Sequence, residues 1–207
     1  MPLKTLASVN RTCENIVPKG FQTLSAHIVL IRFLRKRKMC FRILSLDQAL
    51  ILATDRFRSG EFRALEILLR AVSRAGDGYF WLVMLAVALA TGHTKASVVG
   101  ILAATLGLSA SLFLKHVCRR ARPEGGANWG RFLAPDKYSF PSGHTTTAFS
   151  LAIVTATHWP AIAPALWVCA GCIAVSRTLL GFHYLSDVIA GAALGLLSGL
   201  SAVRILS

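Results

Sequence analysis

The sequence contains apolar runs that are long enough to cross a lipid bilayer. Ala96–Leu114 is a run of 19 residues without a charged side chain, and Tyr184–Leu206 extends over 23 residues with one acid and one arginine. About 20 apolar residues in a helix span the hydrocarbon core of a membrane. Charged residues make up 15% of the chain, whereas soluble domains carry about 25%, and the mean hydropathy is +0.57. These features predict an integral membrane protein and argue against a soluble domain.

The apolar segments predict an all-α fold, an integral membrane helical bundle of about five transmembrane helices with an interfacial amphipathic segment before them. Residues 43–75 place apolar side chains at helical spacing among arginines, which is typical of a helical hairpin in the membrane interface; a short span is the alternative. The last expected span is rich in glycine, which lets helices approach closely. The five expected spans are Tyr79–Thr91, Ala96–Leu114, Thr145–Trp159, Ala161–Leu180 and Tyr184–Leu206.

The N-terminal residues 1–38 differ from the remainder in charge. They hold eight basic residues and one acid, which is half of the chain's net charge of +14. They are interpreted either as a disordered basic arm that touches anionic headgroups or as a stretch upstream of a true start at Met39. We therefore expect an N-terminal extension, residues 1–38, and a membrane domain, residues 39–207. Because an apolar membrane body presents no basic groove, the expected partner is anionic lipid or phosphate and not nucleic acid.

Ionisable residues gather at three places where apolar helices end, and such residues are functional candidates. The first contains Lys115 and Arg122, which are seven residues apart and would point to the same side of one helix, with Pro123 ending that helix. A positive cluster on the cytoplasmic side of the membrane is the alternative. Arg119 and Arg120 either add to phosphate or headgroup binding or are solvated.

The second place is Pro141-Ser142-Gly143-His144, directly before an apolar helix. A glycine there lets free backbone N–H groups approach an anion, which the helix dipole also favours. Ser142 adds a hydroxyl, and His144 adds a group that exchanges a proton near neutral pH. A simple capped helix start is the alternative.

The third place combines Ser176-Arg177 with His183 and Asp187. His183 and Asp187 are four residues apart, on one face of a helix. The carboxylate can hold one imidazole nitrogen and leave the other free as a nucleophile or base. A buried His–Asp hydrogen bond without chemistry is the alternative.

Together, the cations, two histidines, one acid and a helix N-terminus suit a phosphoryl group. One histidine can attack phosphorus while the other protonates the leaving oxygen. Metal binding by the same His and Asp side chains is a weaker interpretation, because several fixed positive charges nearby would repel a divalent cation.

The pattern Lys115-x6-Arg122-Pro123, Pro141-Ser142-Gly143-His144 and Ser176-Arg177-x5-His183-x3-Asp187 resembles the three-part signature of the type 2 phosphatidic acid phosphatase superfamily. The resemblance covers about residues 43–206, and all three parts are complete and in order. The chain departs from the commoner six-span arrangement of that family in its N-terminal part.

The resemblance implies an enzyme that hydrolyses phosphate from a lipid without metal or cofactor. His183 would be the nucleophile that forms a phosphohistidine, Asp187 would orient it, and His144 would act as general acid and then as base. The implied phosphate-binding residues are Lys115, Arg122, Ser142, Gly143 and Arg177.

A small membrane core with its site at helix ends suits a substrate whose tail lies in the bilayer. The compact chain is similar to bacterial enzymes that dephosphorylate undecaprenyl pyrophosphate, the expected substrate; phosphatidic acid, diacylglycerol pyrophosphate, phosphatidylglycerophosphate and lipid A phosphate are alternatives. A positive-inside count places the site in the cytoplasm, but the resemblance implies a site on the periplasmic side of the inner membrane, which we expect. A non-enzymatic protein that binds or transports lipid phosphate is the alternative from another functional class.

Overall fold

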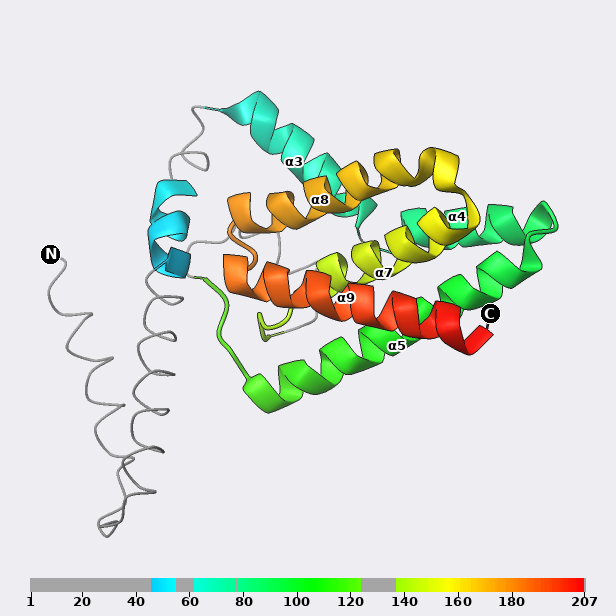
Figure 1. Cartoon of the computed structure of the whole chain (residues 1–207). Coiled ribbons are helices and arrows are strands. Elements are labelled where there is room, and N and C mark those ends of the chain that lie inside the picture. Colours follow the sequence, from blue (N-terminus) through cyan, green and yellow to red (C-terminus); the bar gives the residue numbers. More distant parts are fainter. Residues whose placement is uncertain (1–45, 55–61, 77, 124–136, 207) are drawn as a thin grey trace, which may run out of the picture. The chain divides into compact units, whose positions relative to one another are not determined.

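The computed structural model describes residues 46–54, 62–76, 78–123 and 137–206 (Figure 1). Within these residues there is no strand, only one isolated bridge between Ala121 and Tyr138. The expected all-α fold is therefore confirmed for this part of the chain, and the predicted extension, residues 1–38, lies outside it. The helices are a short one over residues 46–54, α3 (Arg63–Ala75), α4 (Tyr79–Ala90), α5 (Thr94–Cys118), α7 (Gly143–His158), the 3-10 helix η1 (Pro160–Ile162), α8 (Ala163–Leu179) and α9 (Leu185–Leu206).

Three described helices are long and apolar enough to cross a membrane: α5, α8 with its preceding 3-10 helix, and α9. The helices α4 and α7 have 12 and 16 residues, which at 1.5 Å per residue is about 18 and 24 Å, short of a hydrocarbon core of about 30 Å. The helices α3 and α4, bent by 47° relative to each other, pass the same test when taken together, as a broken span or a re-entrant loop. The structure thus supports an integral membrane protein, but the expected number of five spans is not confirmed, nor is an interfacial position for residues 43–75.

Helix α7 is the centre of the bundle and packs against α5, α8 and α9 (Figure 1). Three glycines of α9, Gly191, Gly195 and Gly199, lie so close to α7 that a Cβ on any of them would collide with it. Leu151 of α7 and Ile173 of α8 belong to one buried cluster, which also contains Trp81 of α4. The small residues expected to bring helices together therefore do so along α9.

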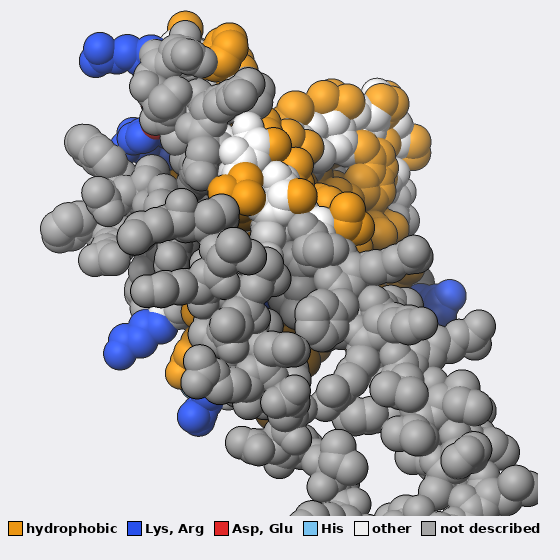
Figure 2. Space-filling view, turned by 90° about the vertical axis from the view of Figure 1, so that its left-hand side faces the viewer, with side chains coloured by type: hydrophobic (Ala, Val, Ile, Leu, Met, Phe, Trp, Pro, Cys, Tyr) orange, Lys and Arg blue, Asp and Glu red, His pale blue; other side chains and the backbone are white. Residues whose placement is uncertain are grey.

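The outer surface of the bundle is apolar. Large side chains such as Val87, Ile101, Val175 and Leu197 are more than half exposed although they lie in apolar helices. Figure 2, which views the end of the bundle where α8 ends, shows hydrophobic side chains over much of the described surface, with Lys and Arg at separate points. A lipid environment would cover such a surface, because soluble proteins rarely expose contiguous apolar patches of this kind.

Successive helices run in alternating directions, and this brings the three sequence motifs to one end. Helices α5 and α8 end there, and α7 and α9 begin there (Figure 1). The helix ends place backbone N–H groups from α7 and α9 beside side chains from the last turns of α5 and α8. The topology therefore assembles the site from segments that are far apart in the sequence.

Candidate active site

Helix α5 ends within the first motif, earlier than the sequence predicts. Helix α5 ends at Cys118, because Arg119 takes a left-handed backbone conformation with φ 46°. Lys115 is in the last turn and is 5% exposed, whereas Arg122 lies in the extended segment beyond the helix. The prediction that both cations lie on one face of the same helix is wrong. They nevertheless converge, since Arg122 Nη1 donates to the Phe182 carbonyl at 3.1 Å, next to His183.

The second motif forms the start of α7. Ser142 is the N-cap and Gly143 the first helical residue. The Ser142 side chain does not cap the helix; its hydroxyl accepts a hydrogen bond from the Thr145 hydroxyl at 3.0 Å. A Cβ on Gly143 would lie 3.7 Å from Lys115 Nζ, so the glycine backbone faces the ammonium group of the first motif. The start of α7 and the last turn of α5 therefore meet at Gly143.

Gly76, the residue that follows α3, lies close to the second motif. A Cβ on Gly76, just after α3, would lie 2.9 Å from Ile173 Cγ2 and 3.3 Å from His144 Cδ2. His144 itself is half-buried in the first turn of α7. The α3–α4 connection therefore forms part of the wall beside His144.

The third motif spans the end of α8 and the start of α9. Arg177, in the last turn of α8, is 5% exposed. Its Nη1 donates to Ser73 Oγ of α3 at 2.6 Å, and its guanidinium lies 4.5 Å from the centre of the Phe182 ring. The backbone turns at Gly181, where φ is +70°, a value that glycine adopts without strain. This turn carries His183 back toward the bundle.

His183 and Asp187 are buried together, at 1% and 0% exposure. His183 lies in the loop before α9 and not on the helix, which corrects the expectation that both share a helical face. The two side chains still face each other, with 3.6 Å between His183 Nδ1 and Asp187 Oδ2. Asp187 Oδ2 also accepts the Tyr184 N–H at 2.9 Å, so it caps the start of α9.

Burial is the main cause that lowers the pKa of His183 well below its usual value. The positive charges of Arg177, Arg122 and Lys115 lower that pKa further, and His144 contributes in the same direction. An imidazole surrounded by cations in a dry site stays neutral, because protonation would add a like charge without solvation. The structure thus brings together the candidate residues of all three motifs around a neutral imidazole.

Sequence reasoning missed the contacts that three groups, Arg120, Asp47 and Ser73, make at this site. Asp187 Oδ1 accepts a hydrogen bond from Arg120 Nη1 at 2.8 Å, and Arg120 Nη2 reaches Asp47 Oδ2 at 2.8 Å. Arg120 was expected to add to phosphate or headgroup binding or to be solvated; the structure shows two ion pairs, which were not foreseen. Arg120 lies between Lys115 and Arg122, and this position inside the first motif could have marked it as a site residue. Nothing in the sequence around Asp47 indicates that Arg120 is its partner. Ser73 was likewise not singled out.

No group of three or more His, Cys, Asp or Glu side chains suited to a metal ion occurs among the residues that the structure describes. Apart from Asp187, the charged side chains that act on His183 are instead cationic. Such a donor set fits an anion with several oxygen atoms.

The fold and the site together define the class: an all-helical integral membrane protein with a buried cationic His–Asp site at the ends of its helices. The chain belongs to the PAP2 superfamily, whose sequence model matches residues 81–207. This match confirms the resemblance that the three motifs carry.

Two of the proteins that the chain resembles in sequence are named as phosphatases. The chain is 41% identical over 95 residues to a lipid A 1-phosphatase of Rhizobium johnstonii, covering 43% of this chain and 38% of that protein. It is 38% identical over 88 residues to a decaprenylphosphoryl-5-phosphoribose phosphatase of Mycolicibacterium smegmatis, covering 42% of this chain and 48% of that protein. The matched part therefore spans less than half of the length of these relatives.

Two solved structures share the fold. The crystal structure of Aquifex aeolicus LpxE superposes with a TM-score of 0.60 at 27% identity, covering 68% of this chain and 86% of that chain. The PAP2-type phosphatidylglycerolphosphate phosphatase from Bacillus subtilis superposes with a TM-score of 0.67 at 23% identity, covering 79% and 86%. At that identity the second comparison concerns the fold alone.

Proposed function

We propose that this protein is a membrane lipid phosphatase that works through a phosphohistidine intermediate. One observation carries the proposal: a buried, neutral His183 beside Asp187, with three cationic side chains close enough to depress the pKa of the imidazole. A protein that only binds a phosphate needs the cations but not a buried His–Asp pair. The names of the relatives, two phosphatases of lipid-linked substrates, support the same conclusion.

In the first step, Nε2 of His183 attacks phosphorus in line with the leaving oxygen. The P–N bond forms as the bond from phosphorus to that oxygen breaks, and the imidazolium Nδ1–H donates to Asp187 Oδ2, 3.6 Å away in the free protein. Such distances often shorten when substrate binds. His144 donates its proton to the departing oxygen, so the lipid leaves as an alcohol or a phosphate.

In the second step, His144 takes a proton from a water molecule that attacks the phosphohistidine. The P–N bond breaks, inorganic phosphate leaves, and His183 returns to its neutral form. The negative charge on the phosphoryl oxygens is largest in the two transition states, where fixed donors in a dry site are most effective. The groups proposed to hold these oxygens are Lys115, Arg122 and Arg177, with Ser142 and the Gly143 N–H.

The proposed substrate is a lipid that carries a terminal phosphate or pyrophosphate. The site lies where apolar helices end, and the helices expose apolar side chains along their length. A lipid tail beside these helices would place its phosphate at the site. Undecaprenyl pyrophosphate is the substrate that we favour, and lipid A phosphate is the second candidate because a relative carries that name. We further propose a bacterial inner membrane with the site on the periplasmic side.

The proposal is tested by phosphate release from purified protein in detergent, with EDTA present. The substrates are undecaprenyl pyrophosphate, lipid A, phosphatidic acid, phosphatidylglycerophosphate and a soluble phosphomonoester. His183→Ala is the inactive variant. The matched control is His93→Ala, because His93 is an exposed histidine in the turn before α5, at the opposite end of that helix from Lys115.

We expect release that resists EDTA, disappears in His183→Ala and persists in His93→Ala. Acid-labile radioactive phosphate should be trapped on the wild type and absent from His183→Ala. Equal release by wild type and His183→Ala would refute the proposed nucleophile. Retained binding of lipid phosphate without release from any substrate would instead favour the binding or transport protein.

A further inference from the structure

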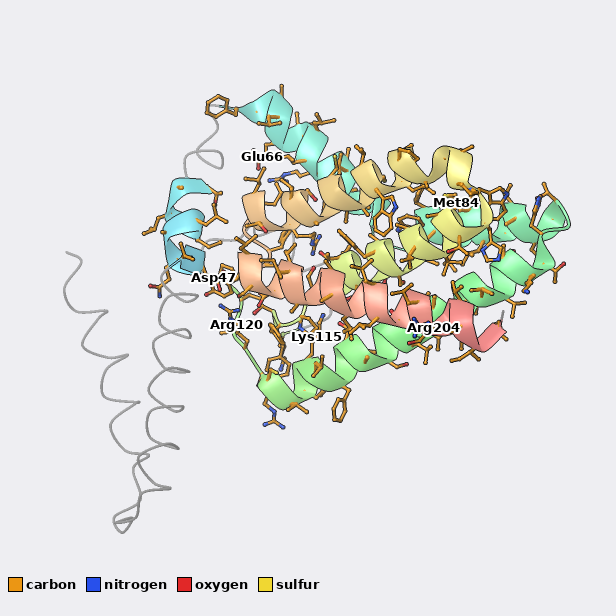
Figure 3. All side chains as sticks on the ribbon, in the orientation of Figure 1. Asp47, Glu66, Met84, Lys115, Arg120 and Arg204 are labelled. Carbon is orange, nitrogen blue, oxygen red and sulfur yellow. The ribbon has the colours of Figure 1, made fainter. Side chains whose placement is uncertain are left out.

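A series of neighbouring polar side chains leads from His183 through Asp187 and Arg120 to Asp47, in the helical segment before α3. Arg120 Nη1 donates to Asp187 Oδ1 and Arg120 Nη2 to Asp47 Oδ2, both at 2.8 Å. Asp47 lies on the helical segment over residues 46–54 and is 2% exposed. Figure 3 shows Asp47 and Arg120 side by side near the start of α9. We propose that Asp47 is a positioning residue, which acts through Arg120 and Asp187 to hold His183 ready for attack.

The first support is the number of contacts that hold Asp47. Its Oδ1 accepts the Ser186 N–H at 3.1 Å, and its Oδ2 accepts the Ser186 hydroxyl. The Ser186 N–H belongs to the first turn of α9, where backbone donors have no partner within the helix. Asp47 therefore caps α9 from a distant segment, while Asp187 caps the same turn through Tyr184.

The second support is the placement of Arg120. Its guanidinium lies 4.0 Å from the centre of the Tyr184 ring, and Nη1 donates to Ser186 Oγ at 2.6 Å. Stacking and several hydrogen bonds fix its plane, which a flexible ammonium group would not achieve. Asp187 therefore meets a rigid partner on the side away from His183.

The third support is that two carboxylates, Asp187 and Asp47, share the positive charge of Arg120. Asp187 must accept the Nδ1–H of His183 well, yet its other oxygen is bound to a cation that reduces its basicity. A second carboxylate on the same guanidinium offsets part of that effect. Without Asp47, the whole charge of Arg120 acts on Asp187, so that the carboxylate attracts the Nδ1–H of His183, 3.6 Å away, less strongly. Because buried charges depend strongly on their partners, the loss of Asp47 is felt at the imidazole.

The inference rests on the proposed phosphatase function, and its first test is kinetic. Asp47→Asn removes the charge but keeps a similar shape. We expect kcat to fall by up to about 100-fold, as for small displacements of reacting groups, while KM changes by less than about twofold because the phosphate-binding cations are untouched. In an Asp187→Asn background, Asp47→Asn should cause no further loss, since Asp47 acts through Asp187.

The matched control is Thr54→Val, on the same helical segment. Thr54 is also 2% exposed, and its hydroxyl donates to the Ile51 carbonyl at 2.9 Å. This variant should keep the wild-type kcat, so that damage to the segment as such is separated from loss of the charge. If Asp47→Asn does not fold, Ser186→Ala replaces it, because it removes the hydroxyl between Asp47 and Arg120 while both charges stay. We expect Ser186→Ala to lower kcat several-fold.

The second test does not require turnover. Nitrogen-15 NMR of the histidines reports which ring nitrogen of His183 carries the proton. We expect the Nδ1–H tautomer in the wild type and in Thr54→Val, and a mixture with Nε2–H in Asp47→Asn or, failing that, in Ser186→Ala. A wild type without phosphatase activity would refute the proposed function, while this tautomer shift would still support the positioning role.

Any of three results would overturn the positioning role. One is a wild-type kcat in folded Asp47→Asn, or in Ser186→Ala where that variant replaces it, with an active wild type. Another is an unchanged His183 tautomer in the same variant. A loss that is additive with Asp187→Asn would also contradict it, because it would place the effect of Asp47 outside the Asp187 contact.

Discussion

At Gly191, α9 packs against the start of α7, where the candidate site lies. The variant Gly191→Ala therefore tests how this packing affects both the stability of the protein and its turnover. A Cβ on Gly191 would lie 2.6 Å from the Ser142 carbonyl oxygen and 3.2 Å from Thr145 Cβ. The Ser142 oxygen belongs to the backbone and accepts the Thr146 N–H at 3.0 Å. It cannot turn aside as a flexible side chain could, so the two helices must separate.

The size of the effect follows from these distances. Ordinary van der Waals contact starts at 3.4 Å, so the new methyl group forces a local shift of about 0.8 Å. Overpacking of this kind costs about 1–3 kcal/mol, which for a chain of this size lowers Tm by about 2–4 °C per kcal/mol. The shift also moves Ser142, whose N–H donates to the Asp187 carbonyl at 3.0 Å. A displacement near 1 Å can cost about 100-fold in rate, and we expect at least a tenfold loss of turnover.

The matched control is Gly171→Ala on α8. Apart from its chain neighbours and the backbone of its own helix, no atom of the described residues lies within 4 Å of a Cβ built on Gly171. Alanine is the better helix former by up to about 1 kcal/mol, so this variant should be as stable as the wild type or slightly more so. Thermal unfolding in detergent and phosphate release on the same preparations measure both effects. Equal Tm and activity for the Gly191 and Gly171 variants would refute the packing argument.

Two further predictions concern the site itself. Because the pKa of His183 is well below its usual value of about 6.5, the imidazole stays neutral on mild acidification, and loss of neutral His183 should not reduce kcat/KM between pH 7.5 and 6.5; a pH–rate profile checks this. The unfolded chain takes up a proton near pH 6.5 that the folded chain does not. The free energy of unfolding should therefore decrease as the pH is lowered below 6.5, and it should decrease less in His183→Gln. Chemical unfolding at several pH values measures this difference. Ser73→Ala removes the acceptor of Arg177 Nη1 and should raise KM several-fold with a smaller effect on kcat, which steady-state kinetics will show; an unchanged KM would mean that α3 does not help to hold this cation.

Several features of the molecule were predictable from the sequence because they depend on local properties. Uncharged apolar runs such as Ala96–Leu114 form helices in a membrane, and the last span brings its glycines against α7. The three motifs were recognisable because Lys115, Ser142 and His183 each lie where an apolar segment ends. Alternating helix directions then place them at one end of the bundle.

Local geometry could not be predicted as well. The spacing of Lys115 and Arg122 suggested one continuous helix, yet α5 ends at Cys118 through the left-handed Arg119. In the same way, His183 lies before α9 and meets Asp187 from a loop. In both cases the side chains converge because the backbone turns toward the site, and sequence periodicity does not report such turns.

The sequence alone singled out the proposed site residues, since histidines, a carboxylate and cations at helix ends are costly in a membrane and are therefore functional candidates. The tertiary structure alone decided what holds them in place. Arg120 meets Asp47 from 73 residues away, and Arg177 meets Ser73 from 104 residues away. Contacts over such separations depend on how the helices pack, and no local pattern in the sequence encodes the partner of a buried charge.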